Sequence, residues 1–194
     1  MFKKIILFTL VFLLSLQVIT DTDFGWHMRT GEYILANWQI PQTDIFSYTL
    51  PNYHYVFHSC ASEVLIFISY KLFGFLGTTT LYAAILTLCI FTLYKICTLL
   101  NKQEPNALLI LWITPIAHGI SGGRTRVFGL LFLAILYFLF LKSRKTNSKL
   151  LYLIPLLFFL WVNFHGSFIL GIFTLIFLIT TDYFFEKNKT VIKF

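Results

Sequence analysis

Two aspartates separated by a single residue, Asp21 and Asp23, stand directly after the first apolar segment of the chain. Two carboxylates at this spacing can share a cation, or one can act as a base while its neighbour tunes it. A carboxylate at a membrane surface is also suited to removing the proton of a substrate hydroxyl group. The structural alternative is a helix cap, because aspartate is favoured at N-cap positions and Asp23 could cap a helix that begins at Phe24. We take both aspartates as candidate catalytic residues.

These aspartates open a polar stretch, residues 21–63, in an otherwise apolar chain. It holds five of the eight acidic residues and three of the five histidines, namely Asp21, Asp23, Glu32, Asp44, Glu63, His27, His54 and His58. Asp23 and His27 are four residues apart and would share one face of a helix. No HExxH or cysteine-based metal motif accompanies them, so we assign no metal ligands. A divalent cation as cofactor stays an open alternative, as do ordinary hydrogen bonds of the histidines at a membrane interface.

Later in the chain, two short polar breaks carry further candidate residues. Arg124 and Arg126 follow the glycine pair Gly122-Gly123. The planar fork of arginine suits phosphate, and glycine lets the backbone come close to a ligand. The alternative is that both arginines anchor a helix end among lipid headgroups. The second break contains His165, between Asn163 and Ser167, and its glycine could also serve close helix packing.

The composition excludes an ordinary soluble domain. The chain is 58% hydrophobic and only 12% charged, with a mean hydropathy of +0.79, whereas about a quarter of the residues of a soluble domain are charged. The formal net charge is +7, but lysine and arginine gather at the ends of apolar segments and form no basic surface with stacking aromatics. We therefore predict no nucleic-acid partner. Three cysteines without a CxxC spacing argue against a disulfide framework or a zinc site.

The apolar segments predict an all-α polytopic membrane bundle with about six transmembrane helices in a single domain, residues 1–194. The first span covers residues 5–20, and we favour a retained anchor over a cleaved signal peptide because no small-x-small cleavage pattern follows it. Residues 21–74 form an outer loop with two interfacial amphipathic helices, at 24–38 and 59–73. The remaining spans lie within residues 78–185, at 78–100, 107–120, 127–141, 150–162 and 168–185.

The basic residues predict the orientation. With the N-terminus in the cytoplasm and six alternating spans, eleven of the fifteen lysines and arginines fall inside, as the positive-inside rule requires. The four outside are Arg29, Lys71, Arg124 and Arg126. The same assignment brings all five histidines to the outer face, which predicts one polar cavity roofed by the 21–63 stretch. A transporter would need polar residues in mid-membrane or an internal repeat, and the sequence has neither.

Several sequence islands, taken in order, resemble one enzyme family. They are Asp21-Thr22-Asp23-Phe24-Gly25-Trp26-His27, Gly31-Glu32-Tyr33-Ile34, Ile40-Pro41-Gln42-Thr43-Asp44-Ile45-Phe46-Ser47-Tyr48-Thr49, His58, Glu63, Gly74, Gly77, Arg124-Thr125-Arg126-Val127-Phe128 and Trp161-Val162-Asn163-Phe164-His165-Gly166-Ser167-Phe168. With these islands the chain resembles the N-terminal part of bacterial polytopic glycosyltransferases of the GT-C type, which are related to the dolichyl-phosphate-mannose protein mannosyltransferases.

The resemblance implies an active site at the outer face of the bacterial cytoplasmic membrane. An acidic catalytic residue after the first span matches Asp21 or Asp23. The donor would be a sugar on a polyprenyl phosphate within the lipid, transferred with inversion to an unspecified glycan, lipid or protein acceptor. We assign substrate binding to six residues, His27, His58, Glu63, Arg124, Arg126 and His165.

The chain departs from this family in two respects. Relatives often have Glu-Trp-Leu after the histidine where this chain has Ser59-Cys60-Ala61, and they are usually much longer. We therefore expect a truncated or N-terminal part of a longer enzyme. The alternative function is a non-catalytic polytopic membrane protein, either an assembly partner or a degenerate transferase fragment.

Overall fold

The computed structural model describes residues 2–50, 53–121, 124–146 and 149–191. Within these ranges the chain is all-α, as predicted, and its only β pairing is an isolated bridge between Thr43 and His54. The helices are α1 (Phe2–Ser15), α2 (Phe24–Asn37), α3 (Cys60–Asn101), α4 (Ala107–Ser121), α5 (Arg126–Thr146), a 3-10 helix η1 (Lys149–Leu153), α6 (Ile154–Phe164) and α7 (Phe168–Val191).

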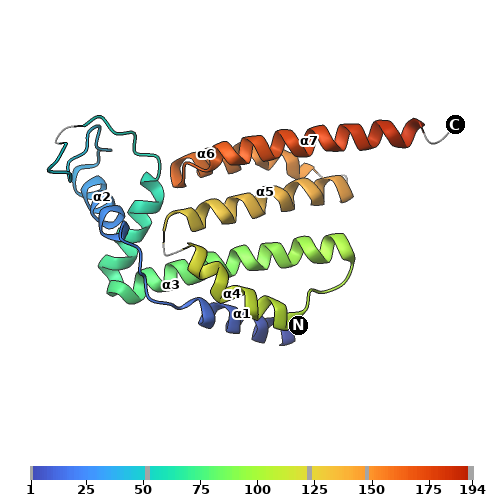
Figure 1. Cartoon of the computed structure of the whole chain (residues 1–194), viewed down its shortest axis with the longest axis horizontal. Helices are drawn as coiled ribbons and strands as arrows, with labels where there is room; N and C mark the ends of the chain where they lie inside the picture. The colour runs from blue at the N-terminus through green and yellow to red at the C-terminus, as the bar shows by residue number, and fades with distance from the viewer. Residues whose placement is uncertain (1, 51–52, 122–123, 147–148, 192–194) are drawn as a thin grey trace.

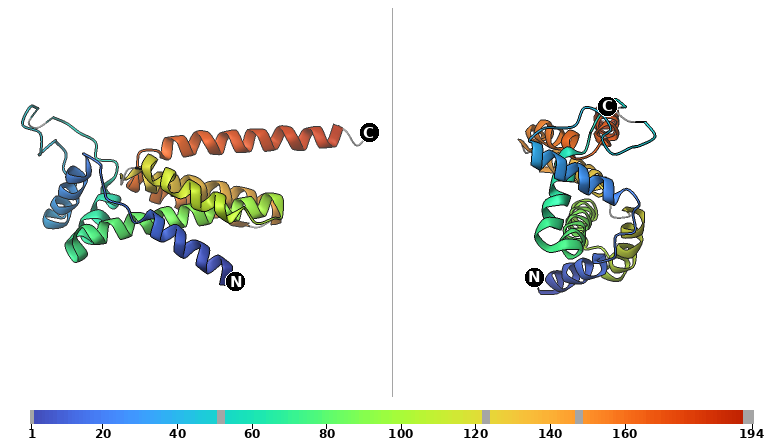
Figure 2. Two further views of the ribbon diagram at one scale, coloured as in Figure 1. Left: turned by 60° about the horizontal axis from the view of Figure 1, so that its bottom comes forward. Right: turned by 90° about the vertical axis from the view of Figure 1, so that its left-hand side faces the viewer.

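The helices divide into a longitudinal group and a cap across one end (Figure 1). The second part of α3 and helices α5, α6 and α7 run along the long axis, with α1 and α4 beside them. Helix α2 and the first part of α3 lie across one end, and both chain termini point away from that end (Figures 1 and 2). Helix α3 is central, since it contacts α1, α2, α4, α5 and α6.

A kink at Gly74 joins the cap to the longitudinal group. Gly74 has φ +60° and ψ −148° inside α3, a conformation that residues other than glycine rarely adopt. Three residues later, a Cβ on Gly77 would lie 2.1 Å from the carbonyl oxygen of Ser69. The two helices predicted at 59–73 and 78–100 are thus confirmed as the two parts of α3, which meet at a kink at Gly74, and the kink turns the first part across the end of the bundle.

Other predicted boundaries need correction. The first helix ends at Ser15 rather than near residue 20, and just after its end Gln17 donates from Nε2 to the Leu14 carbonyl at 3.0 Å. The segment predicted at 150–162 begins as the 3-10 helix and becomes α6, and α7 continues to Val191 instead of ending at 185. The pair Gly122-Gly123 lies outside the described residues.

Two helices, α3 and α5, are long and apolar enough to cross a membrane, and shorter apolar helices cover Ala107–Gly119, Lys149–Phe164 and Phe168–Phe184. Large apolar side chains fill the interior, such as Trp161 and Leu136, which are fully buried. Others face outward on the shorter helices, including Trp112 at 74% and Phe173 at 66% exposure. A monomer in water rarely carries so much apolar surface, so length, composition and surface indicate membrane association.

The end of the bundle away from α2 is held by basic residues. Lys4 pairs with Glu104 at 2.6 Å and Arg144 pairs with Asp182 at 2.8 Å. Lys145 donates from Nζ to the carbonyl oxygen of Leu99. These contacts join the start of α1 to the α3–α4 connection, and α5 to α3 and α7. Basic residues that are far apart in the sequence therefore lie at the same end of the bundle, opposite to α2.

Candidate functional site

Asp21, Asp23 and Arg124 form the ionic centre of the cap end. The guanidinium of Arg124 pairs with Asp21 through Nε and with Asp23 through an amino nitrogen at 3.2 Å. The side chain of Asp21 is 3% exposed, whereas that of Asp23 is 47% exposed. Because the buried Asp21 carboxylate hydrogen-bonds Arg124, it raises the pKa of that guanidinium. The guanidinium of Arg124 therefore stays positively charged. Of the two carboxylates that it contacts, that of Asp23 is the one exposed to solvent.

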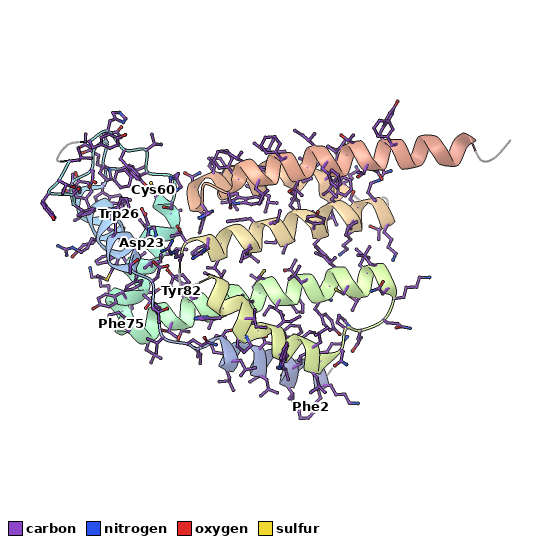
Figure 3. The ribbon with its side chains drawn as sticks, viewed as in Figure 1. Phe2, Asp23, Trp26, Cys60, Phe75 and Tyr82 are labelled. Carbon is purple, nitrogen blue, oxygen red and sulfur yellow. The ribbon has the colours of Figure 1, made fainter. Side chains whose placement is uncertain are left out.

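The helix-cap alternative for Asp23 is not what the structure contains. Asp23 stands at the N-cap position of α2, but its side chain makes no capping hydrogen bond. Instead the carboxylate of Asp21 accepts from the backbone N–H of Asp23 at 2.7 Å. Asp21 thus organises the backbone at the start of α2, which leaves the Asp23 side chain directed to Arg124 and to solvent. Figure 3 marks Asp23 where α2 meets the longitudinal helices.

One helical turn further along α2, His27 contacts the first part of α3. Its Nδ1 donates to Glu63 Oε1 at 2.9 Å, and the hydroxyl of Ser59 donates to the same oxygen at 2.9 Å. Glu63 is 4% exposed, and its second oxygen, Oε2, has no hydrogen-bond partner among the described residues. The helices approach closely because of Gly31, where a Cβ would lie 2.1 Å from the Glu63 carbonyl oxygen. Sequence spacing predicted neither Ser59 nor Gly31 in this contact, although Ser59 and Glu63 stand four apart.

His165 belongs to a hydrogen-bonded group between α6 and α7. Its Nδ1 accepts from the backbone N–H of Ser167 at 3.1 Å and lies 2.8 Å from the Ser167 hydroxyl. Because Nδ1 already accepts from that backbone N–H, it is unprotonated, so the hydroxyl donates to it while accepting from Trp161 Nε1 at 3.0 Å. Nδ1 therefore carries a lone pair and the ring proton sits on Nε2. Sequence reasoning missed Trp161 and Ser167 as the residues that orient this histidine.

The remaining candidate residues lie beside this group. The His58 ring is 6.5 Å from the His165 ring, measured between centroids. Arg126 is the first residue of α5 and is exposed. Ser62 links the first part of α3 to α6 by donating to the Phe164 carbonyl at 2.8 Å. The structure thus gathers all eight candidate residues at the cap end, in three groups: Asp21, Asp23 and Arg124; His27 and Glu63; His58, His165 and Arg126.

Burial lowers the pKa of His165 to about 4, and the nearby charges of His58, His27 and Arg126 act in the same direction. The unfolded histidine titrates near 6.5. Between these values the unfolded chain binds more protons than the folded chain, so folding stability falls as the pH drops from about 6.5 towards 4.

We predict that His165→Asn flattens this pH dependence. Asparagine can still accept the Ser167 backbone N–H but carries no titrating ring. The measurement is the midpoint of thermal unfolding in detergent between pH 7 and pH 4, with His54→Gln as the control variant. If the unfolding midpoint falls equally steeply with decreasing pH in both variants, His165 is not the source of the pH dependence.

Within the described residues, no group of three or more His, Cys, Asp or Glu side chains is arranged to hold a metal ion. The Arg124 guanidinium occupies the position between the Asp21 and Asp23 carboxylates that a shared cation would need. The arrangement therefore suits proton transfer at the exposed carboxylate of Asp23 and electrostatic binding of a ligand. The buried carboxylates of Asp21 and Glu63 orient the residues that they contact.

Nothing matches the chain among protein-family models, curated proteins or solved structures. The functional argument rests on the residues and their geometry.

Proposed function

We propose that the chain belongs to a polytopic membrane glycosyltransferase of the GT-C type. It transfers a sugar from a polyprenyl-phosphate donor to an acceptor hydroxyl at the outer face of the bacterial cytoplasmic membrane. The observation that carries the proposal is the half-exposed carboxylate of Asp23, held by Arg124 beside the buried carboxylate of Asp21. The motif order around these residues supports the same class.

In this proposal Asp23 is the general base. It takes the proton of the acceptor hydroxyl as that oxygen bonds to the anomeric carbon. The bond from the anomeric carbon to the phosphate oxygen breaks on the opposite face, and its electron pair leaves with the lipid phosphate. The product therefore has the inverted configuration. Asp21 and Arg124 are positioning residues, because Asp21 fixes both the guanidinium and the backbone of Asp23.

A groove between α1 and α3 supports a lipid-linked donor. It has a volume of about 600 Å³ and is lined almost wholly by apolar side chains, among them Phe8, Phe12, Leu88 and Phe91, with Lys4 at one edge. An isoprenoid or acyl chain fits such an apolar surface.

The proposed orientation puts the α2 end outside and the end with Lys4, Lys102 and Lys145 in the cytoplasm. We predict that Tyr48→Cys reacts with a membrane-impermeant maleimide in intact cells, because Tyr48 is 93% exposed in the 21–63 stretch. Lys102→Cys, in the α3–α4 connection, should react only after the membrane is opened. Both variants are made in a background without Cys60, Cys89 and Cys97. The reverse labelling pattern contradicts the orientation.

The enzymatic proposal is tested in membranes from cells that express the full-length protein. A panel of radiolabelled polyprenyl-phosphate sugars is supplied, and label transferred to acceptors is measured for the wild type and for the Asp21→Ala, Asp23→Ala double variant. The proposal expects transfer by the wild type and background label with the variant. Equal label in both means that the catalytic assignment fails, and the non-catalytic membrane protein then becomes the better account.

A further inference from the structure

The groove between α1 and α3 has a charged edge that the proposed donor does not use. Its apolar wall includes Phe8, Leu88 and Phe91, and Lys4 stands at one edge. Lys4 lies near the start of α1, at the end of the bundle opposite to α2 (Figure 1). A donor that reacts beside Asp23 carries its phosphate at the α2 end. The Lys4 edge therefore suits a different lipid, with its headgroup at the opposite end of the groove.

We infer that this groove binds an acyl chain of an anionic phospholipid, whose headgroup phosphate is held by Lys4, Lys95 and Tyr94. These three residues form the headgroup site, and the apolar wall of the groove forms the chain site. Binding to the purified protein requires no sugar transfer. Only the assignment of the lipid to the cytoplasmic leaflet rests on the proposed function, through the orientation proposed with it.

The first argument is the buried hydroxyl group of Tyr94. Tyr94 is 5% exposed, and its hydroxyl has no hydrogen-bond partner among the described residues. A buried tyrosine hydroxyl usually has a partner, because a buried polar group without one is unfavourable. The Lys4 ammonium lies 5.6 Å from the centre of the Tyr94 ring. A phosphate bound by Lys4 would offer an acceptor oxygen to this hydroxyl.

The second argument is that Lys4 can exchange its ionic partner at little cost. Its ammonium pairs with Glu104 at 2.6 Å, and the two side chains are 49% and 61% exposed. An exposed ion pair contributes little to stability, because water screens both charges. When a phosphate replaces the Glu104 carboxylate, Lys4 keeps an anionic partner and Glu104 returns to solvent. The existing pair therefore does not prevent lipid binding.

The third argument is a second lysine beside the same aromatic rings. The Lys95 ammonium lies 5.4 Å from the centre of the Phe91 ring, and Phe91 lines the groove. The Phe8 ring joins the two lysine positions, with its centroid 5.1 Å from that of Phe91 and 5.5 Å from that of Tyr94. Lys4 and Lys95 therefore flank one aromatic cluster. Lys95 is exposed and takes part in none of the salt bridges between described residues.

The charge of this end selects an anionic headgroup over a zwitterionic one. Besides Lys4 and Lys95, it carries Lys102, Lys142 and Lys145. Basic residues at a membrane surface attract the anionic lipids of the cytoplasmic leaflet, and long lysine side chains can extend their ammonium groups to the headgroups. The phospholipid chain and the isoprenoid chain of a donor would use the same groove, so we expect the two lipids to compete.

The test is phospholipid binding to the purified full-length protein in detergent, measured by native mass spectrometry over a range of lipid concentrations. The probes are phosphatidylglycerol, which is anionic, and phosphatidylethanolamine with the same acyl chains. We expect phosphatidylglycerol to bind at least about fivefold more tightly, the usual contribution of one lysine near an anionic lipid. Lys95→Gln should weaken its binding about fivefold, and Tyr94→Phe, which removes only the hydroxyl, about tenfold.

Lys142→Gln is the matched control. Lys142 belongs to the same end of the bundle, and its ammonium lies 5.3 Å from the Phe138 ring, much as Lys95 lies over Phe91. Phe138 does not line the groove, so this substitution should leave phosphatidylglycerol affinity nearly unchanged. Equal losses in Lys95→Gln and Lys142→Gln indicate only a general attraction to the basic end and overturn the site. Equal affinities of the wild type for the two phospholipids also overturn it.

A second measurement uses the wild-type protein alone and so does not depend on variant folding. Phosphatidylglycerol with a photoreactive group in one acyl chain is cross-linked to the protein, and the labelled peptides are identified. Label on α1 and on residues 84–91 of α3 that unlabelled phosphatidylglycerol displaces better than phosphatidylethanolamine supports the site. Label spread over all the apolar helices, or displaced equally by both lipids, overturns it.

These results are separate from those that test the proposed function. A protein that binds phosphatidylglycerol in this groove but transfers no sugar keeps the lipid site and loses the proposed function. A protein that transfers sugar through Asp23 but shows no preference for phosphatidylglycerol loses only the lipid site.

Discussion

Asp23→Asn is expected to lower the rate of sugar transfer by about 10² to 10⁴-fold, the usual contribution of a general base. Asparagine has nearly the same shape and can still accept a hydrogen bond from Arg124, but it cannot take a proton from an acceptor hydroxyl. Folding should change little, because the Asp23 side chain is 47% exposed and caps no helix. The measurement is the initial rate of label transfer in membranes with equal amounts of each protein.

Glu32→Gln is the control for this experiment. Glu32 lies on the same helix, is exposed and pairs with Arg29, so its substitution removes one negative charge without touching the ionic centre. We expect a rate close to that of the wild type. A rate for Asp23→Asn within about threefold of this control would be too small an effect for a general base and would remove Asp23 from the mechanism.

The second large effect is expected from Gly31→Ala, which separates α2 from α3. The added Cβ would lie 2.1 Å from the carbonyl oxygen of Glu63 and 3.0 Å from Cβ of Phe67. Neither group can rotate away, because one is backbone and the other is the first atom of a side chain. Overpacking of this kind costs about 1–3 kcal/mol. The helices must move apart, and the contact between His27 and Glu63 should lengthen.

Gly25→Ala is the matched control, since it is the same substitution on the same helix. A Cβ on Gly25 meets nothing within 4 Å, so stability should equal or slightly exceed that of the wild type. Thermal unfolding in detergent measures both variants, and the His27 resonances report on the contact with Glu63. Equal midpoints for Gly31→Ala and Gly25→Ala would contradict the close approach of α2 and α3.

Much of the fold could be predicted from local patterns. Apolar runs and their glycine or polar breaks predicted most helices to within a few residues, because hydrophobic continuity and helix-breaking residues act locally. The predicted end of α1 was wrong, because the apolar run continues past Ser15 without a glycine, proline or charged residue to mark where the helix stops. The break between the helices predicted at 59–73 and 78–100 is confirmed, because α3 leaves helical geometry at Gly74.

For the candidate site, too, the sequence predicted some features and the structure was needed for others. Polar side chains in an apolar chain suggested the candidate residues, and the predicted topology put Arg124 and His165 on the same membrane face as Asp21. The roles within the group needed the structure, because pairing depends on distances between elements. Arg124 was assigned to phosphate on its chemistry, yet its guanidinium faces two carboxylates. Trp161 and Ser167 look like ordinary helix and loop residues in sequence, and only their hydrogen bonds to each other and to His165 reveal that they orient it.

The most direct test of the catalytic role of Asp23 uses the purified full-length protein in liposomes with a synthetic polyprenyl-phosphate sugar and a mixture of acceptors. One measurement, the anomeric configuration and amount of the new glycoside, is made for the wild type and Asp23→Asn. The predicted result is a glycoside of inverted configuration from the wild type and at least a hundredfold less from Asp23→Asn. A retained configuration, or equal amounts from both proteins, would contradict Asp23 as the base of an inverting transfer.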